Sequence, residues 1–413
     1  MTDLEKQLVS VFKSGVKEKH GFSLGVETEH FVTDKKKNRR VYYDDGVENL
    51  LEEASAFFED VSFFGDRVAS LGNKNYVVTL EPSAQFEVSI RPCENISEIE
   101  NIYNDFLSVF TPLLKKHGFS LEMYGYSRNS LADDCKIIPK ERYRLMNGYF
   151  KSLGNTPQYM MRQTCATQVS IDYFSEKDFV DKLRLASVLS PILYLVSENS
   201  PVTECKKTDN HCPRIDAWRK VDDTRTGIIR NIFDDDFSFE KLAEFYSNIS
   251  PIFIFENGRE VFTGKKTARE IFENKTVTDE NVNHLLSMAF FDSRVKNFIE
   301  IRSADSMPVE FTLAYCSLIK GVFSSENTVK SLLDFANCKT TKEIENAKTQ
   351  VALFGYEAEV YGKNAKQFAE FVIENAKNNL NESEKKYILL LENCVKSGKS
   401  VYEFSEETDE ISR

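Results

Sequence analysis

Glutamates recur at alternate positions in segments of this sequence that have the pattern of β-strands. In GVETEHF, the two-residue period of a strand places Glu27 and Glu29 on the same face. In TLEPSAQFEVSI, Glu87 lies on the polar face of a second strand, and Glu81 stands just before Pro82, where that strand must bend or start. Carboxylate oxygens are the ligands that hard divalent cations such as Mg²⁺ prefer. Metal binding is therefore the first chemistry that these residues suggest.

Two further segments repeat the pattern. TCATQVSIDY places Gln168 and Asp172 on one face, and NFIEIRSAD places Glu300 and Arg302 on one face, each opposite an apolar face. A sheet face made mainly of carboxylates and amides repels itself unless cations occupy it. Together the four segments predict a site for several Mg²⁺ ions. From alternation alone, exposed strands with incidental acidic residues remain the alternative.

Several Mg²⁺ ions held by carboxylates are typical of enzymes whose substrate carries phosphates. The nearest approach to a phosphate-binding P-loop is GREVFTGKKT, which has the wrong glycine spacing and Lys266 where Ser or Thr is required. ATP, if bound, must therefore be held by metals and arginines. Arg302 is the best candidate because it shares a face with Glu300, and arginine binds phosphate or carboxylate bidentately. For the other arginines, surface salt bridges are the alternative.

The elements that must position these residues are mixed strands and helices without a regular βαβ rhythm, which favours an α+β fold with an antiparallel sheet. Strands are expected near residues 23–33, 75–90, 160–173 and 296–303. After Pro308 the pattern becomes helical, and Val309–Phe323 is apolar almost all round and should be buried. We predict a single large catalytic domain over residues 1–413, comprising a sheet core (1–310), a helical C-terminal region (311–400) and a frayed acidic tail (401–413).

Composition limits the partners and the compartment. With 53 Lys and Arg against 65 Asp and Glu, the net charge of −12 disfavours binding to nucleic acid or anionic membranes. The run Lys35–Arg40 is expected to be a solvated hairpin turn, with phosphate binding as the alternative. Eight scattered cysteines and a polar N-terminus predict a reduced, cytoplasmic protein. A monomer and a homodimer are both compatible with the sequence.

The same segments resemble the glutamate–cysteine ligase family, in the branch that includes the plant-type enzymes. The resemblance runs in order over roughly residues 20–310, through GVETEHF, LEPSAQFEVS, PKERYRLMNGYF, MMRQTCATQVSID, LVSENSP, RIDAW, DDTRTG and FIEIRSAD. Relatives often have two glycines where Ser83 and Ala84 stand, and a glycine in place of Ser303. Because these positions adjoin the candidate ligands, nucleotide placement or substrate preference could differ from the family pattern.

The resemblance implies a glutamine-synthetase-like fold, in which a curved, mostly antiparallel sheet flanked by helices forms a funnel-shaped active site. It also implies the reaction: ATP phosphorylates the γ-carboxylate of L-glutamate, and the amine of L-cysteine displaces the phosphate to give γ-glutamylcysteine. Two or three Mg²⁺ ions would be bound by Glu27, Glu29, Glu81, Glu87, Gln168 and Glu300. Arg302 and Glu300 would be catalytic, and the substrates and ATP would contact Arg162, Thr164, Trp218, Arg225 and Arg302.

Two alternatives remain at this stage. One is a carboxylate–amine ligase of the same fold that uses a different amine, since the acceptor pocket cannot be recognised in these motifs. The other is a non-catalytic relative that binds nucleotide or metal. The presence of every candidate ligand disfavours this second alternative, because a decayed enzyme commonly loses at least one.

Overall fold

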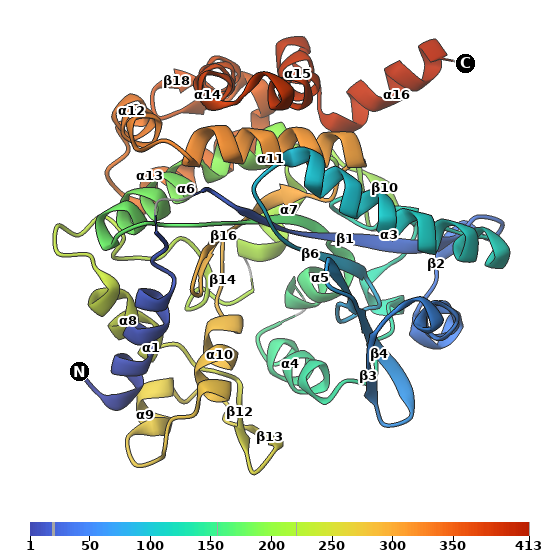
Figure 1. Cartoon of the computed structure of the whole chain (residues 1–413), viewed down its shortest axis with the longest axis horizontal. Helices are drawn as coiled ribbons and strands as arrows, with labels where there is room; N and C mark the ends of the chain where they lie inside the picture. Colours follow the sequence, from blue (N-terminus) through green and yellow to red (C-terminus); the bar gives the residue numbers. More distant parts are fainter. Residues whose placement is uncertain (19–20, 155, 220, 413) are drawn as a thin grey trace.

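A ten-stranded antiparallel sheet lies at the centre of the computed structural model, which describes residues 1–18, 21–154, 156–219 and 221–412. Its main path runs through β15 (Ser293–Val295), β16 (Ile299–Asp305), β8 (Ala166–Ile171), β1 (Leu24–Asp34), β6 (Phe86–Cys93), β5 (Tyr76–Leu80), β4 (Arg67–Gly72) and β3 (Asp60–Phe64). Two short strands, β2 (Arg39–Arg40) and β7 (Phe119–Glu122), also pair with β1. The sheet is open, and it curves, because β1 runs across the view in Figure 1 whereas β3 and β4 run down it.

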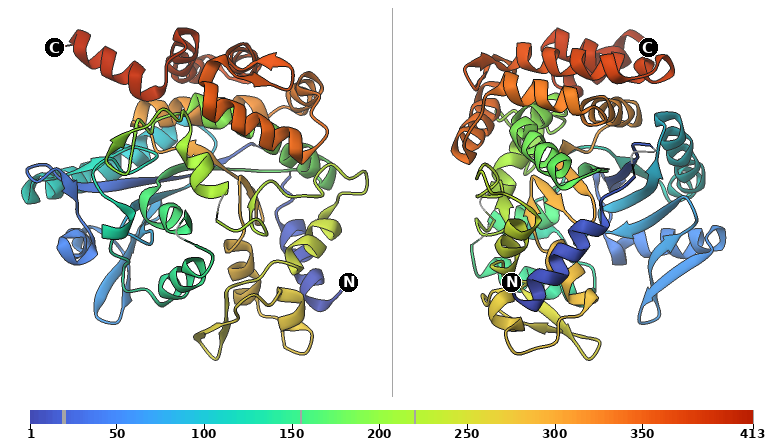
Figure 2. Two further views of the ribbon diagram at one scale, coloured as in Figure 1. Left: turned by 180° about the vertical axis from the view of Figure 1, so that it is seen from behind. Right: turned by 60° about the vertical axis from the view of Figure 1, so that its left-hand side comes forward.

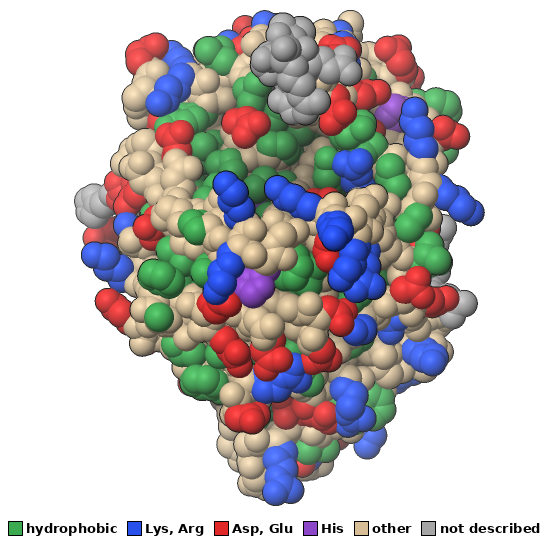
Figure 3. All heavy atoms as spheres, turned by 90° about the vertical axis from the view of Figure 1, so that its right-hand side faces the viewer, with side chains coloured by type: hydrophobic (Ala, Val, Ile, Leu, Met, Phe, Trp, Pro, Cys, Tyr) green, Lys and Arg blue, Asp and Glu red, His purple; other side chains and the backbone are tan. Residues whose placement is uncertain are grey.

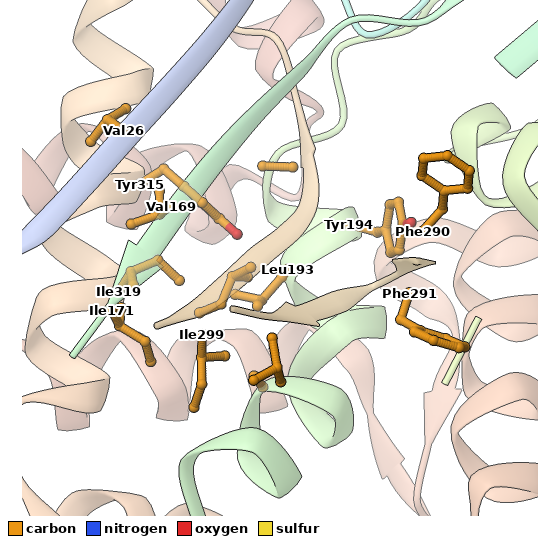
Figure 4. Close-up of a cluster of buried hydrophobic side chains, with 14 of the residues drawn as sticks. Val26, Val169, Ile171, Leu193, Tyr194, Phe290, Phe291, Ile299, Tyr315 and Ile319 are labelled. Carbon is orange, nitrogen blue, oxygen red and sulfur yellow. The ribbon is translucent and has the colours of Figure 1, made fainter. Parts of the chain in front are cut away.

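The apolar faces of the central strands pack against two buried helices, α6 (Glu176–Val196) and α11 (Val309–Phe323). Figure 4 shows Val26, Val169 and Ile299 from three neighbouring strands beside Leu193 of α6 and Ile319 of α11. All five side chains are at most 1% exposed. The prediction that Val309–Phe323 forms a buried helix is confirmed, and burial of apolar area on this scale is the main stabilising contribution to such a fold.

Further helices form an outer layer over α6 and α11, at the top of Figure 1: α12 (Glu326–Ala336), α13 (Thr341–Phe354), α14 (Ala365–Asn379), α15 (Glu382–Ser397) and α16 (Val401–Ser412). The segment predicted to be an acidic tail contains α16, which continues to Ser412. Its first turn is held by the backbone N–H of Val401, which donates to the carbonyl of Glu198 at 2.9 Å. No helix within the described part of the chain is long and apolar enough to cross a membrane.

Shorter elements cover the polar face of the sheet, in the lower half of Figure 1 and in both views of Figure 2. They are α1 (Asp3–Ser14), α4 (Glu141–Lys151), α5 (Thr156–Gln163), α8 (Phe239–Ser247), α9 (Ala268–Phe272), α10 (Asp279–Ser287) and the hairpin β12 (Phe253–Glu256)–β13 (Arg259–Phe262). A further short helix, α7 (Pro213–Arg219), packs against α5. Two helices, α2 (Val47–Ala54) and α3 (Ile96–His117), also pack against the sheet, at β4 and at β6 and β7 respectively. The remaining strands form the small pairs β9 (Val202–Thr203)–β10 (Lys206–Lys207), β11 (Thr226–Gly227)–β14 (Phe290–Phe291) and β17 (Glu359–Val360)–β18 (Lys363–Asn364).

Two strand predictions need correction. The strand expected over 160–173 begins only at Ala166, because residues 156–163 form α5. The strand expected over 75–90 is divided into β5 and β6 by a turn at Glu81–Gln85, in which the Ala84 N–H donates to the Glu81 carbonyl at 3.0 Å. Ala84 occupies the left-handed region there, with φ of 59°, which glycine tolerates better than alanine.

The basic run Lys35–Arg40 forms the predicted hairpin turn, except at its last residue. The Lys36 and Lys37 N–H groups donate to the Asp34 carboxylate, and residues 35–39 are exposed. Arg40, in contrast, is only 3% exposed and donates to the Ser83 carbonyl at 2.6 Å. On the face drawn in Figure 3, basic side chains are interspersed with acidic ones rather than forming one continuous basic surface.

Candidate active site

Strand pairing brings the predicted acidic residues together. The four strands expected to carry polar faces are direct neighbours in the order β16, β8, β1 and β6. Glu27 of β1 lies opposite Gln168 of β8, and Glu29 of β1 lies opposite Glu87 of β6. Since like charges directly across a strand pair are destabilising, an arrangement of this kind favours a ligand that supplies positive charge.

A cavity of about 250 Å³, called here the acidic cavity, opens on this face. Eight of the predicted site residues line it: Glu27, Glu29, Glu81, Glu87, Thr164, Gln168, Trp218 and Arg302. The other lining residues are Pro82, Gln85, Arg142, Tyr143, Met146, Met160, Met161, Ser287, Phe290, Arg294 and Lys296. The cavity thus combines a carboxylate wall on the sheet with a wall of cations and apolar side chains.

Two carboxylates of the acidic cavity, Glu29 and Glu87, accept hydrogen bonds from uncharged donors. Glu87 accepts a hydrogen bond from the Thr79 hydroxyl at 2.6 Å, and Glu29 accepts from the Ala166 backbone N–H at 2.8 Å and the Gln168 amide at 3.1 Å. Burial, followed by repulsion from neighbouring carboxylates, raises the pKa of both Glu27 and Glu87 from 4.5 to about 7. The same two causes raise the pKa of Glu29 well above its usual range. These groups are poised to take up either protons or metal cations.

Glu300 lies in a different environment. It is fully buried and forms ion pairs with Arg294 at 2.7 Å, Arg302 at 2.8 Å and Lys296 at 3.8 Å. These three cations hold the pKa of the Glu300 carboxyl well below its usual range, although burial opposes them. Among the predicted metal ligands it is the one that does not line the acidic cavity, but the three cations that it pairs with do line it.

Arg302 connects the two walls of the acidic cavity. Its guanidinium group donates to the Gln168 side-chain oxygen and lies 5.7 Å from the centre of the Trp218 ring. Gln168 in turn donates to Glu29, so one hydrogen-bonded chain runs from Glu300 through Arg302 and Gln168 to the carboxylate wall. Held at both ends in this way, Arg302 faces the cavity with little rotational freedom.

The other two predicted substrate arginines do not line the cavity. Arg162 donates to the Ala132 carbonyl at 3.0 Å and to the Asn147 side chain at 2.9 Å. Arg225 is completely buried and pairs with Asp222 at 2.8 Å. In this structure both guanidinium groups hold the segments around the cavity in place.

Sequence reasoning missed three cations of the lining: Arg142, Arg294 and Lys296. A signal for two of them exists, since Arg294 and Lys296 alternate as strand residues do, and Arg294 pairs directly with Glu300 in the β15–β16 hairpin. Arg142 lies in the PKERYRLM segment at the start of α4, and its Nε atom is buried without a hydrogen-bond partner within the described part of the chain. The two-residue alternation that identified the strand carboxylates does not apply to Arg142, because it lies on a helix.

The residues on the carboxylate wall fit a divalent cation by their chemistry. Within the described ranges no three acidic, histidine or cysteine side chains already converge as a ready-made metal site. The acidic cavity nevertheless gathers four glutamates, two of which accept hydrogen bonds from neutral donors, together with the Gln168 amide. Carboxylate and amide oxygens are the donors that Mg²⁺ takes in proteins, usually beside substrate phosphates.

An open antiparallel sheet, covered by helices on its apolar face and carrying carboxylates beside arginines on its polar face, defines a glutamine-synthetase-like fold. A solved structure with this fold, a glutamate–cysteine ligase from Francisella tularensis in complex with AMP, aligns with 92% of this chain and 82% of its own, with a TM-score of 0.52 and 10% sequence identity.

Sequence comparison identifies the family. The sequence model of glutamate–cysteine ligase family 2 (GCS2) matches residues 23–388 of this chain. Chloroplastic glutamate–cysteine ligases from Brassica juncea and Arabidopsis thaliana are 29% and 27% identical to this chain over 91% of its length, and the aligned regions cover 74% and 73% of those relatives. The chain therefore belongs to glutamate–cysteine ligase family 2 and is an enzyme of that family.

Proposed function

We propose that the chain joins the γ-carboxylate of L-glutamate to the amine of L-cysteine, with ATP and Mg²⁺, through a γ-glutamyl phosphate. The products are γ-glutamylcysteine, ADP and phosphate. The observation that carries this proposal is the acidic cavity, where four glutamates face Arg302, Arg294 and Lys296 across about 250 Å³. Family membership supports the same amino acid substrates.

A second cavity supports the use of a nucleotide. It measures about 700 Å³, within the range of small-molecule sites, and it shares Glu27 with the acidic cavity. Its floor includes the small residues Gly25, Ser89 and Ser170 of three adjacent strands, which leave space above the sheet. We assign this second cavity to ATP and the acidic cavity to the amino acids, so that phosphoryl transfer takes place near Glu27.

The chemistry requires positioning and neutralisation of charge. A carboxylate is a poor electrophile, and phosphorylation converts one of its oxygens into a leaving group. Glu27, Glu29, Glu81, Glu87 and Gln168 would hold the Mg²⁺ ions, which when bound would offset the charge of the triphosphate.

The chain itself supplies a preorganised cation. Arg302 has its guanidinium group oriented by Glu300 and Gln168, and it would donate hydrogen bonds to the phosphoryl group or to the glutamate carboxylate. In this proposal Glu300 acts by keeping Arg302 and Arg294 in place.

The test is release of phosphate by the purified chain. We expect release to require ATP, Mg²⁺, glutamate and cysteine together, and mass spectrometry to identify γ-glutamylcysteine. Release with another amine but not with cysteine would overturn the acceptor assignment. No release with glutamate and any of the twenty amino acids as acceptor would overturn the ligase proposal itself.

We also propose that the protein works in the cytoplasm as a monomer or homodimer. The scattered cysteines, which are typical of reduced thiols, support this location. Several plant relatives are named chloroplastic, so cell fractionation is the deciding measurement for location, and light scattering is the one for oligomeric state.

A further inference from the structure

Lys296 lies where the two cavities meet. It lines the acidic cavity, and the next two residues, Asn297 and Phe298, line the second cavity. Glu27, the one residue common to both linings, is on the same face of the sheet. Lys296 sits in the tight turn between β15 and β16, where its backbone N–H donates to the Phe298 carbonyl at 3.0 Å. The turn fixes the backbone, so the lysine stem extends from a rigid base.

The ammonium group of Lys296 lies farther from the Glu300 carboxylate than do the guanidinium groups of Arg294 and Arg302. Arg294 and Arg302 each approach a Glu300 oxygen within hydrogen-bonding distance, at 2.7 and 2.8 Å, and their side chains are 10% and 12% exposed. Lys296 is 3.8 Å from the nearest Glu300 oxygen, which is beyond hydrogen-bonding distance, and its side chain is 30% exposed. Its donors are therefore available to a ligand in the cavity.

We propose that Lys296 is a catalytic residue that binds the terminal phosphoryl group of ATP during transfer, an assignment that rests on the ligase function proposed above. A γ-carboxylate oxygen of glutamate attacks the γ-phosphorus, and a new carbon–oxygen–phosphorus linkage forms. The bond from the γ-phosphorus to the β,γ-bridging oxygen breaks, and its electron pair leaves on ADP. Lys296 stays protonated throughout and donates hydrogen bonds to the non-bridging oxygens of the transferring group. A compact ammonium suits this role because it acts as a point charge on phosphate.

The test compares K296Q and K296R with the wild-type chain, and with K386Q as a matched control on the exposed face of α15. We expect K296Q to lower kcat by about 10²–10³-fold, the usual effect of removing one such donor, with the KM for glutamate changed less than about 3-fold. K296R should recover part of the loss, and K386Q should behave as wild type.

A second readout separates a catalytic role from a structural one. Binding of ADP with aluminium fluoride, which mimics the transferring phosphoryl group, is compared with binding of ADP alone, both with Mg²⁺ and glutamate. We expect K296Q to bind the mimic at least about 30-fold more weakly and ADP almost unchanged, because only the mimic carries the group that Lys296 contacts. If K296Q does not fold, K296M, which keeps the aliphatic stem, is measured in its place.

The outcomes are distinguishable. An inactive wild-type chain would refute the proposed function. An active wild-type chain whose K296Q variant keeps kcat within about 3-fold would refute the assignment of Lys296 alone. Equal weakening of ADP and of the mimic would also overturn it, because Lys296 would then be a ground-state or structural contact.

Discussion

Replacing Glu87 with glutamine should make the protein more stable and inactive at once. Glu87 is buried opposite Glu29, and in the absence of a cation its ionised form is unfavourable. Its pKa is raised from 4.5 to about 7, a difference that corresponds to about 3.5 kcal/mol at about 1.4 kcal/mol per unit. Glutamine is isosteric, and its amide oxygen can still accept from the Thr79 hydroxyl, which now donates at 2.6 Å. The substitution removes the charge and keeps the packing.

The pH dependence follows from the direction of this shift. Because the folded chain binds the Glu87 proton more tightly than the unfolded chain, the penalty is complete above about pH 7 and fades as the pH falls toward 4.5. We therefore expect E87Q to raise the free energy of unfolding by about 2–3 kcal/mol at pH 8 without Mg²⁺, and by much less at pH 5.

The assay is urea unfolding at both pH values, alongside the phosphate-release assay. E357Q is the matched control, since it removes one charge from an exposed position. We expect E357Q to leave both stability and turnover near wild type. Two results would refute the reasoning: an E87Q variant no more stable than wild type at pH 8, or a gain of equal size at pH 8 and pH 5.

Three other substitutions test the same physical picture. E300Q should instead destabilise the fold by about 3 kcal/mol in urea unfolding, because it leaves the buried charges of Arg294 and Arg302 without their carboxylate; a variant as stable as wild type would contradict this. A84G should raise the free energy of unfolding by about 1 kcal/mol, since Ala84 has a φ of 59°, and a loss of stability would show that the turn tolerates alanine without strain. Burial lowers the pKa of His284 from 6.5 to about 4, so its contribution to stability is complete above pH 6.5 and is lost as the pH falls toward 4. The stability difference between wild type and H284Q should therefore shrink over that range in urea titrations, and a difference independent of pH would refute the buried neutral histidine.

Local pattern was sufficient to predict the strands that carry Glu27, Glu29 and Glu300. Alternation in GVETEHF and FIEIRSAD predicted two strands with one polar face each, and both strands are present with those faces as expected. The same reasoning failed for residues 160–165, where the apolar and polar residues also fit a helix end. Tertiary contacts favour the helix in that segment, because Gln163 at its end is buried and donates to the Ser130 carbonyl at 3.1 Å. The local sequence pattern around Gln163 contains no information about Ser130, which is 33 residues away in the chain.

The candidate site was predictable in its carboxylates but not in its cations. Glu27, Glu29 and Glu87 were recognisable because charged residues facing one side of a buried strand are rare unless they have a use. Arg162 and Arg225 lie in the right segments, yet their side chains bond to Asn147 and Asp222 instead of lining the cavity. The direction in which a long side chain points depends on its neighbours in space, which sequence spacing does not specify.

By itself, then, the sequence determined the faces of the strands, the acidic character of the site and the family, because alternation and ordered motifs are local properties of the chain. Only the tertiary structure decided which faces meet. Pairing of β16, β8, β1 and β6 in one sheet set Glu29 opposite Glu87 and enclosed Glu300 among three cations. Strand order and register arise from long-range packing, and a shift of one residue would turn every one of these side chains to the opposite face. Alternation with Arg294 marks Lys296 as a cation of this face, but its position where the two cavities meet is visible only in the folded molecule.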